Sequence, residues 1–585
     1  MKDDTVKDPA LRHDLTAFYW WTAWAAVTER PGSTVSYTNN WPADETVGNH
    51  APASAFIWTV FSVLFLIAGI GLLGWHHARV QATDRGPSPI PDSDPLALVR
   101  ITPSMRATAK FFGIVMALFL VQILFGAMTA HYQVEGQSLY GFPLAQILPY
   151  ALTRTWHTQI AVLWIATAWL GTGLYLAPAL SGHQPRFQRL GVNILWTCLL
   201  VIVVGAFSGQ WLAVMQKLGL QYNFWFGHQG WEYVDLGRFW QWFLFVGLAL
   251  WLTLVGRALW PLMTRRDESR PVVTLLFLST VAIGLFYGAG LMWNEHTHLA
   301  MIEYWRWWVV HLWVEGFFEV FATAAIALLF TRLGLVRART ATDALLFATI
   351  VFMGGGVLGT LHHLYFTGTP TAVLALGASF SALEVVPLAY LGVEAYQTYR
   401  LGLAAPWMAR YRWPILFFTA VSFWNLVGAG LFGFLINPPL ALYYMQGLNL
   451  TPLHGHTALF GVYGMLGIGL MLFCLRGLRP AARWNERLLR TAFWSFNVGL
   501  CLMALLTLLP MGILQVTAAI QHGYWYARSA DFMQQPLLHL LVWLRVPGDV
   551  IFSLGACALA AFVASLWLQP KNVPVTITEP GTRTR

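Results

Sequence analysis

The chain has 585 residues, of which 57% are hydrophobic and only 10% are charged, and it contains 30 tryptophans. This composition excludes an ordinary soluble domain and predicts an integral membrane protein. The net charge of +9 does not indicate a nucleic-acid partner, because the basic residues fall in short loops between apolar stretches, where membrane topology accounts for them.

The sequence predicts about thirteen membrane-spanning helices, because apolar stretches of roughly 20 residues are long enough to cross about 30 Å of hydrocarbon. The stretches begin near Phe56, Ala107, His157, Asn193, Trp240, Val272, Trp307, Ala344, Thr371, Pro414, His454, Thr491 and Val546. An earlier apolar run, from Ala17 to Val27, is too short and too rich in tryptophan to be counted as a span. The expected fold is therefore an all-α integral membrane bundle.

Arginines occur in every second loop between the predicted spans, for example Arg186 and Arg189 in one loop and Arg265 in a later one. Because basic loops stay on the cytoplasmic side, this alternation places the N-terminus outside and the C-terminus in the cytoplasm. The charged residues 1–14 do not form a signal peptide. An external start without an export signal leaves two alternatives: either this topology is wrong, or a transmembrane segment that precedes Met1 is absent from this sequence.

The cysteines predict neither a disulfide framework nor a Cys-x-x-Cys metal site, because all of them lie inside predicted spans. They are Cys198, Cys474, Cys501 and Cys557. The sequence also has no Cys-x-x-Cys-His motif, which excludes a covalently attached c-type haem. The paired cysteines of a dinuclear copper site are missing as well, so electrons must enter by another route.

Histidines within the predicted spans share one depth. Since successive spans alternate in direction, the outer half of the membrane contains His157, His311, His362, His363, His454 and His456. A lone membrane histidine usually hydrogen-bonds to a neighbouring helix. Six at one level favour bound haem and metal instead, because imidazole is the usual axial ligand of haem iron and a common metal ligand.

The spacing of these histidines predicts more than one centre. His454 and His456 are two residues apart, so on a helix they point to different sides, and each can hold one of two haems. The adjacent His362 and His363 lie at a span end, where the backbone relaxes, and they can converge with His311 on a single metal.

This pattern resembles the heme-copper oxidase superfamily. The resemblance implies a low-spin haem on His157 and His456, a high-spin haem on His454, and a non-haem metal on His311, His362 and His363. Typical oxygen-reducing members carry a tyrosine one helical turn after the first metal histidine, whereas this sequence has Glu315 there.

Glu315 favours nitric oxide over oxygen as the substrate. Three imidazoles with a carboxylate are a harder ligand set than imidazoles alone, which favours iron over copper. Glu384 resembles the second active-site glutamate of nitric oxide reductases, so the resemblance implies catalytic roles for both glutamates and makes Glu315 an iron ligand. For Glu319, one turn further along, a helix–helix hydrogen bond and a proton role are both open.

Three further motifs resemble the quinol-dependent branch of the nitric oxide reductases, namely residues 37–42 (YTNNWP), 225–232 (WFGHQGWE) and 296–298 (HTH). By this resemblance His131, Glu135 and Asp549 form a quinol site at the outer surface, where a basic nitrogen and a carboxylate can take up the protons that quinol releases. His131 and Glu135 are expected just past the outer end of the second span, and Asp549 at the outer start of the last. Taken singly, each is an ordinary interfacial polar residue.

Glu232 resembles a glutamate that binds a structural calcium ion between haem propionates, and a salt bridge to Arg238 is the alternative. Protons are expected from the outer side, because no line of carboxylates crosses the inner half of the spans. Their expected route includes Glu295, Glu303, Glu315 and Glu384.

The resemblance covers nearly the whole chain and divides it into four parts. Residues 1–52 are the expected remnant of a periplasmic cytochrome c-like domain, 53–106 a linking transmembrane helix and cytoplasmic loop, 107–570 the heme-copper oxidase-like core, and 571–585 a cytoplasmic tail. Family members usually begin with one more span and a fuller cytochrome c-like domain, which this sequence lacks.

The implied protein is an oxidoreductase of the bacterial inner membrane. It would carry two haem b groups, one non-haem iron and a calcium ion, oxidise ubiquinol or menaquinol, and reduce NO to N2O and water. A homodimer in the lipid bilayer is compatible with this resemblance.

Three alternatives stay open. A terminal oxidase would need the tyrosine that is missing here. An NO dismutase would lack non-haem iron ligands that this chain keeps. A transporter with a buried histidine cluster would show internal repeats and helices broken at mid-membrane, and the sequence has no such repeat.

Overall fold

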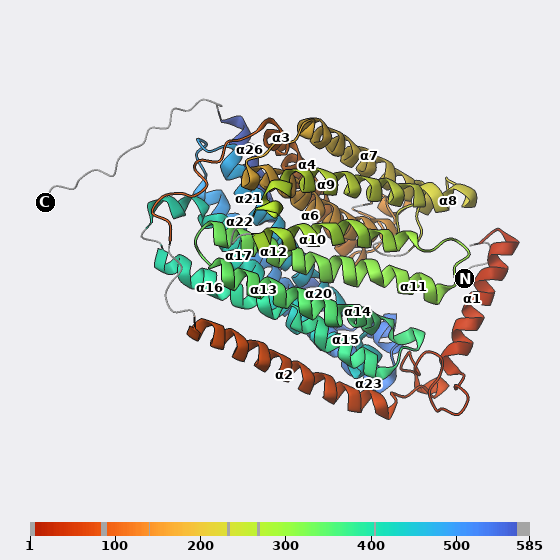
Figure 1. Cartoon of the computed structure of the whole chain (residues 1–585). Helices are drawn as coiled ribbons and strands as arrows, with labels where there is room; N and C mark the ends of the chain where they lie inside the picture. Colours follow the sequence, from red (N-terminus) through yellow and green to blue (C-terminus); the bar gives the residue numbers. More distant parts are fainter. Residues whose placement is uncertain are drawn as a thin grey trace.

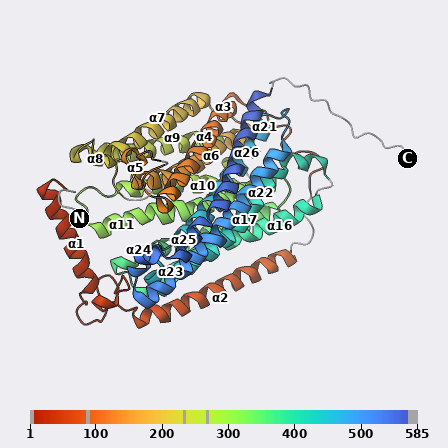
Figure 2. The ribbon, with the colours of Figure 1, turned by 180° about the vertical axis from the view of Figure 1, so that it is seen from behind.

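The computed structural model describes the backbone of residues 6–83, 90–139, 141–230, 235–265, 270–402 and 405–569, and their side chains apart from those of 80–83, 220, 315–317 and 401–402. Within these ranges the chain is helical, with isolated β-bridges and no named strand. The long helices run side by side as one bundle (Figure 1, Figure 2). The predicted all-α membrane fold is confirmed.

Among the described residues, thirteen helices are long and apolar enough to cross a membrane, as the sequence predicts. They are Ala53–Arg79, Pro103–Val134, Tyr150–Ser181, Gln188–Val214, Arg238–Thr264, Arg270–Leu291, Leu299–Arg332, Ala338–Thr367, Thr371–Arg400, Pro406–Ile436, Leu450–Leu478, Glu486–His522 and Pro536–Leu568. The predicted start of the last span at Val546 is wrong, because the short helix α25 (Pro536–Trp543) precedes α26 (Val546–Leu568) within the same span.

The centre of the bundle is formed by helices that other helices surround on all sides. Every residue of α12 (Phe318–Arg332) up to Phe330 is buried, and so is every residue of α21 (Met465–Leu478) up to Arg476. At the opposite extreme, α2 (Ala53–Thr83) lies along one edge (Figure 1), and only Ala55 and Ser62 are buried among its described side chains. Ser62 holds this edge helix by hydrogen bonds to Ser379 and to the Ala375 carbonyl, both 2.9 Å long.

Several spans are interrupted along their length by segments that are not α-helical. The π-helical segments are η3 (Trp308–Phe317), η4 (Phe352–Gly356), η7 (Asn425–Leu431), η8 (Leu459–Gly464) and η9 (Met503–Leu508). Such segments often occur at functional sites. Backbone groups that leave the regular ladder at membrane depth are tolerated only where protein surrounds them. Each of these segments has a buried face, with residues such as Gly355 and Gly428, although residues such as Met353 in η4 are exposed.

The first helix, α1 (Pro9–Val27), does not run with the spans but lies across one end of the bundle (Figure 1, Figure 2). None of its residues is buried. Residues 28–50 follow as a loop segment on the same end of the bundle. This segment contains η1 (Glu45–Val47), and other connections contain α5 (Leu144–Ile147), α8 (Leu220–Phe226), α19 (Pro439–Met445), η10 (Tyr526–Arg528) and α24 (Ala530–Met533).

Glycines allow α22 (Glu486–Leu502) and α26 to pack with their backbones in contact. A Cβ atom added at Gly499 would lie 2.8 Å from the backbone nitrogen of Phe552 and 2.9 Å from the carbonyl oxygen of Gly548. In a membrane, the hydrophobic effect does not drive helices together, so their association depends on close packing, which small residues at the crossing allow. This crossing therefore depends on the absence of a side chain at Gly499.

We expect Gly499→Leu to push α22 and α26 apart and to destabilise the protein by about 2 kcal/mol or more, as overpacking does when backbone atoms cannot move aside. The midpoint of thermal unfolding in detergent would measure this loss. Gly113→Leu is the matched control, because a Cβ at Gly113 meets nothing within 4 Å. Equal stability of the two variants would contradict the packing argument.

Candidate haem and metal centre

His311, His362 and His363 lie together inside the bundle. Their ligand nitrogens are all within 4.8 Å of one another. His363 Nε2 is 2.9 Å from His362 Nε2 and 3.2 Å from His311 Nδ1. His311 and His362 have exposed fractions of 0%. The structure thus brings the three predicted ligands of the non-haem metal to one point in an apolar interior.

Irregular backbone carries all three side chains. His311 lies in the π-helical segment η3, and the other two lie in η5 (Thr360–Thr367), a 3-10 helix interrupted at Leu364. The His363 ring stacks on Trp307, with ring centroids 3.9 Å apart and planes inclined by 3°. Trp307 Nε1 in turn donates to the Glu303 carboxylate at 3.2 Å. These contacts fix the plane of the His363 imidazole.

The backbone approaches the cluster closely at Gly359. A Cβ atom added at Gly359 would lie 2.8 Å from His311 Nε2. Glu315 follows His311 by one helical turn in η3, but its side chain lies outside the described residues. Three imidazole nitrogens this close together fit a divalent transition metal.

His157 on α6 (Tyr150–Ser181) and His456 on α20 (Leu450–Ala458) face each other, with ring centroids 6.1 Å apart. His157 Nδ1 donates to the Gln122 carbonyl at 2.9 Å, and His456 Nδ1 donates to the Pro452 carbonyl at 2.7 Å. An imidazole whose Nδ1 is engaged in this way presents Nε2 to a metal. Two metal–nitrogen bonds of about 2 Å fit between such rings, so the pair fits the axial positions of one haem.

His454 is held separately from His456 although both lie on α20. Its Nδ1 donates to the Gly428 carbonyl of η7 at 2.9 Å. A Cβ atom at Gly433, on α18 (Phe432–Ile436), would lie 2.9 Å from His454 Cε1. The two histidines therefore have different neighbours, an arrangement that fits one haem on each side of α20.

Two buried carboxylates lie near these centres. Glu384 is 5% exposed and ends α15 (Thr371–Leu383) at the break before α16 (Val386–Gly402). Glu319 on α12 is 3% exposed and accepts a hydrogen bond of 2.8 Å from Asn425 Nδ2. Asn425 lies on η7, the segment whose Gly428 carbonyl binds His454. The helix–helix hydrogen bond, one of the two alternatives for Glu319, is therefore present.

The predicted quinol residues form two separate pairs. His131 makes an ion pair with Glu135, and Arg545 Nε donates to Asp549 at 3.0 Å. α4 (Ala109–Val134) packs against α26, but among the described side chains no hydrogen bond or ion pair joins the two pairs. Arg545 lies within electrostatic range of both His157 and His456.

Two predicted positions in this region need correction. His131 does not lie past the end of its span but in the last turn of α4. Asp549 is not at the start of the last span, because α25 has already entered it.

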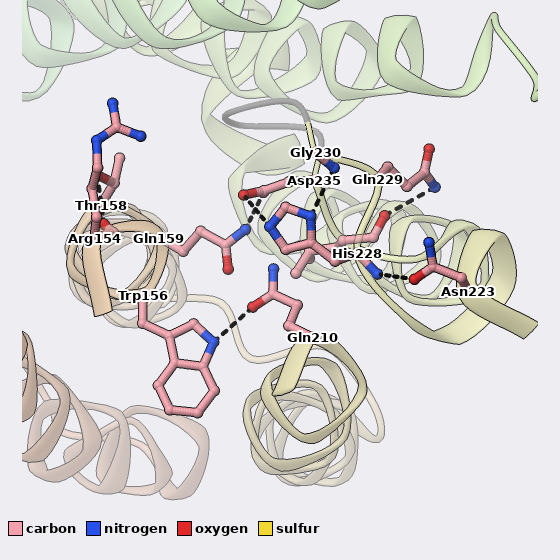
Figure 3. Close-up of polar contacts among 11 residues, drawn as sticks. Arg154, Trp156, Thr158, Gln159, Gln210, Asn223, His228, Gln229, Gly230 and Asp235 are labelled. Carbon is pink, nitrogen blue, oxygen red and sulfur yellow. Dashed lines mark hydrogen bonds and ion pairs between the residues drawn. The ribbon is translucent and has the colours of Figure 1, made fainter. Parts of the chain in front are cut away.

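Figure 3 shows the loop after α8 reaching across to α6. His228 Nε2 lies 3.9 Å from Asp235 Oδ2, and Gln159 of α6 donates to the other oxygen of that carboxylate. Burial lowers the pKa of the His228 imidazole. Because Gln159 follows His157 by two residues, this loop is attached to the turn of α6 that carries His157.

Glu232, the predicted calcium ligand, lies outside the described residues of the same loop. The alternative partner, Arg238, is buried and donates to the carbonyls of Gly290, at 3.3 Å, and of Trp293. The calcium site remains a prediction.

Sequence reasoning missed the residues that hold the ligands in place. Trp307 and the Gln122 carbonyl contact His363 and His157, and Asn425 donates to Glu319; all of these partners are distant in sequence, and no local motif marks them. A weak signal was available for Asn425, a polar side chain inside an otherwise apolar span.

Comparisons with known proteins agree with this geometry. Residues 106–551 match the family described as Cytochrome C and Quinol oxidase polypeptide I, and residues 1–43 match the NorB cytochrome c-like domain of nitric oxide reductase. The chain is 26% identical over 512 residues to a subunit of the nitric oxide reductase of Stutzerimonas stutzeri, and the match covers 81% of this chain and 97% of the relative.

The fold is also similar to that of a solved heme-copper terminal oxidase dimer, with a TM-score of 0.58 and 14% identity over 81% of this chain and 86% of the other. At this identity the likeness shows the fold alone. The family match, by contrast, spans more than half of the chain and includes all six histidines. The chain is thus a multi-pass oxidoreductase of the membrane that belongs to the Cytochrome C and Quinol oxidase polypeptide I family of heme-copper oxidases, as a nitric oxide reductase-like member.

Proposed function

We propose that the protein reduces two NO molecules to N2O and water with electrons from a membrane quinol. The observation that carries this proposal is the cluster of His311, His362 and His363 with a glutamate, Glu315, one turn after the first histidine. A tyrosine at that turn would serve O–O cleavage, whereas joining two NO molecules needs no such group. The relative from Stutzerimonas stutzeri supports the same substrate.

The residues divide into sites for three cofactors. His157 and His456 would hold a low-spin haem b, His454 a high-spin haem b, and the three clustered histidines with Glu315 a non-haem iron. When bound, these groups would transfer electrons and bind NO. The chain fixes the imidazoles by hydrogen bonds at their second nitrogen, a support that orients ligands and raises their basicity.

The carboxylates supply and hold protons in this proposal. Glu303 accepts hydrogen bonds from Trp307 Nε1 and from Arg306 Nη1, at 3.2 and 3.3 Å, on the side of the cluster where α11 (Leu299–Trp307) begins. Buried Glu384 is the second proton-holding group. Protons would reach the centre from the outer face, where exposed Glu295 lies.

The electron donor would bind near the outer ends of α4 and α26. Asp549, held by Arg545, would accept a proton from quinol, and the His131–Glu135 pair would accept or orient the second hydroxyl. Electrons released there would pass to the haem between His157 and His456. Ubiquinol and menaquinol both meet this chemistry, and the bacterial inner membrane contains such donors.

Purified protein should contain two b-type haems and one non-haem iron, and should form N2O from NO with reduced quinol. His311→Ala should lose the non-haem iron and lower NO turnover by more than about 100-fold, the upper range for loss of a group that only supports a metal ligand. Metal analysis per haem and gas chromatography of N2O would measure both.

The control for this substitution is His539→Ala, since His539 is exposed on α25. A stoichiometric copper ion with oxygen consumption and no N2O would assign the protein to the terminal oxidases instead. N2 and O2 as products would indicate an NO dismutase.

Asp549→Asn should lower kcat/KM for quinol by about 100-fold, because a carboxylate that takes up a proton in the reaction contributes on that order. NO reduction driven by a small artificial electron donor should stay unchanged, since that donor bypasses the quinol site. Asp531→Asn, at an exposed position on α24, is the matched control. An equal loss with both donors would contradict a role in quinol oxidation.

A further inference from the structure

The segment of residues 28–50 contacts the turn that carries His362 and His363. Asn39 Nδ2 donates to the Tyr365 carbonyl at 3.1 Å and to the Thr369 carbonyl at 3.0 Å. Tyr365 Oη donates back to the Asn39 carbonyl at 3.2 Å. Asn39 is 8% exposed and Tyr365 is fully buried. These bonds join residues more than 300 positions apart in the sequence.

The bonds fall on the carbonyl end of η5, where a helix needs outside partners. The last carbonyls of a helix find no N–H donor within the helix, and local turns or side chains usually supply one. Here Asn39 binds one of them, the Tyr365 carbonyl, which also accepts from the Gly368 nitrogen at 3.1 Å. Its second acceptor is the Thr369 carbonyl just beyond the end of η5, and Arg30 Nη2 donates to the Gly368 carbonyl at 3.3 Å. A guanidinium at this end also complements the negative end of the helix dipole.

The loop that presents Asn39 is fixed by its own hydrogen bonds. Asn39 and Asn40 have φ values of 60° and 57°, in the left-handed region that asparagine tolerates better than most residues. Asn40 accepts from the Ser36 nitrogen at 2.7 Å and donates to the His50 carbonyl at 3.2 Å. Asn39 is therefore held out by a stiff loop rather than by a flexible chain.

The backbone of η5 is irregular, so it does not by itself fix the directions of the His362 and His363 imidazoles. η5 is a 3-10 helix with a non-helical residue, Leu364 (φ −102°, ψ 33°), directly after His363. Trp41 adds a second contact on this turn, with its ring centroid 5.8 Å from that of Phe366. The segment thus touches the turn immediately after the paired histidines.

We propose that Asn39 is a positioning residue for the metal centre: its side-chain amide caps the end of η5 and so fixes the directions of His362 and His363. The segment of residues 28–50, which lies outside the membrane bundle, thereby completes the ligand geometry inside it. This inference rests on the proposed metal centre and is independent of which gas is reduced.

The test compares Asn39→Asp with Asn49→Asp in the full chain. Aspartate keeps the size of asparagine and its tolerance of positive φ, but it presents an oxygen to two carbonyls in place of the amide donors. Asn49 belongs to the same segment and is equally buried, yet its Nδ2 donates only to the Pro42 carbonyl, at 3.1 Å, within that segment.

Each purified variant is stripped with a chelator and titrated with Fe2+, and its haem content and low-spin haem spectrum are recorded. Asn39→Asp should bind iron about tenfold to a hundredfold more weakly, the usual effect of losing a group that supports metal ligands. Its two haems and their spectrum should be unchanged, and Asn49→Asp should bind iron like the unsubstituted protein. Asn39→Gly, which keeps the backbone conformation and removes the side chain, should also weaken iron binding.

Three results would overturn the inference. Unchanged iron affinity in Asn39→Asp and Asn39→Gly would show that the turn positions itself. Equal losses in Asn39→Asp and Asn49→Asp, or loss of the haems together with the iron in Asn39→Gly, would show a general role in folding. If the unsubstituted protein contained no metal besides its two haem irons, the proposed metal centre itself would be wrong. This result is distinguishable from the outcomes above, which concern the variants.

Discussion

An imidazole inside a bilayer has two nitrogens to satisfy, and the arrangement of this protein follows from that requirement. His157, His454 and His456 each direct Nδ1 to a backbone carbonyl. The other nitrogen is then available to a metal, with its tautomer already set. A carbonyl that accepts such a bond must face the protein interior, because lipid offers no replacement for it. The ligands therefore require enclosing helices, and α12 and α21 are enclosed on every side.

The interruptions in the spans follow from the same requirement. In η7 the backbone departs from α-helical geometry, and its Gly428 carbonyl receives His454 while Asn425 in the same segment binds Glu319. In η3 and η5 the irregular geometry lets histidines from two spans converge. Broken helices at membrane depth are also typical of transporters, so the breaks alone could have indicated the wrong class. The histidines that cluster beside these breaks favour a metal centre over a transport site.

The number of spans and the depth of the histidines could be predicted from the sequence, because hydrophobic length and alternation along the chain determine both. The convergence of His311 with His362 and His363 followed from that depth and from the resemblance. The hydrogen bonds that surround the site could not be predicted. Asn39 and Tyr365, and likewise Glu319 and Asn425, are distant in sequence and meet only after the chain has folded. The last span was predicted to start near Val546, whereas α25 begins it at Pro536, so Asp549 lies further along the span than the sequence predicted.

The Glu319–Asn425 hydrogen bond also bears on the order of synthesis. The two residues are 106 positions apart, and a ribosome adds about 5–20 residues per second. For an interval on the order of ten seconds, α12 therefore exists without the amide that Glu319 binds in the finished protein. A carboxyl group in hydrocarbon is expensive to leave unsatisfied. The nascent helix must wait in the insertion machinery, or keep its carboxyl group protonated, until the tenth span arrives.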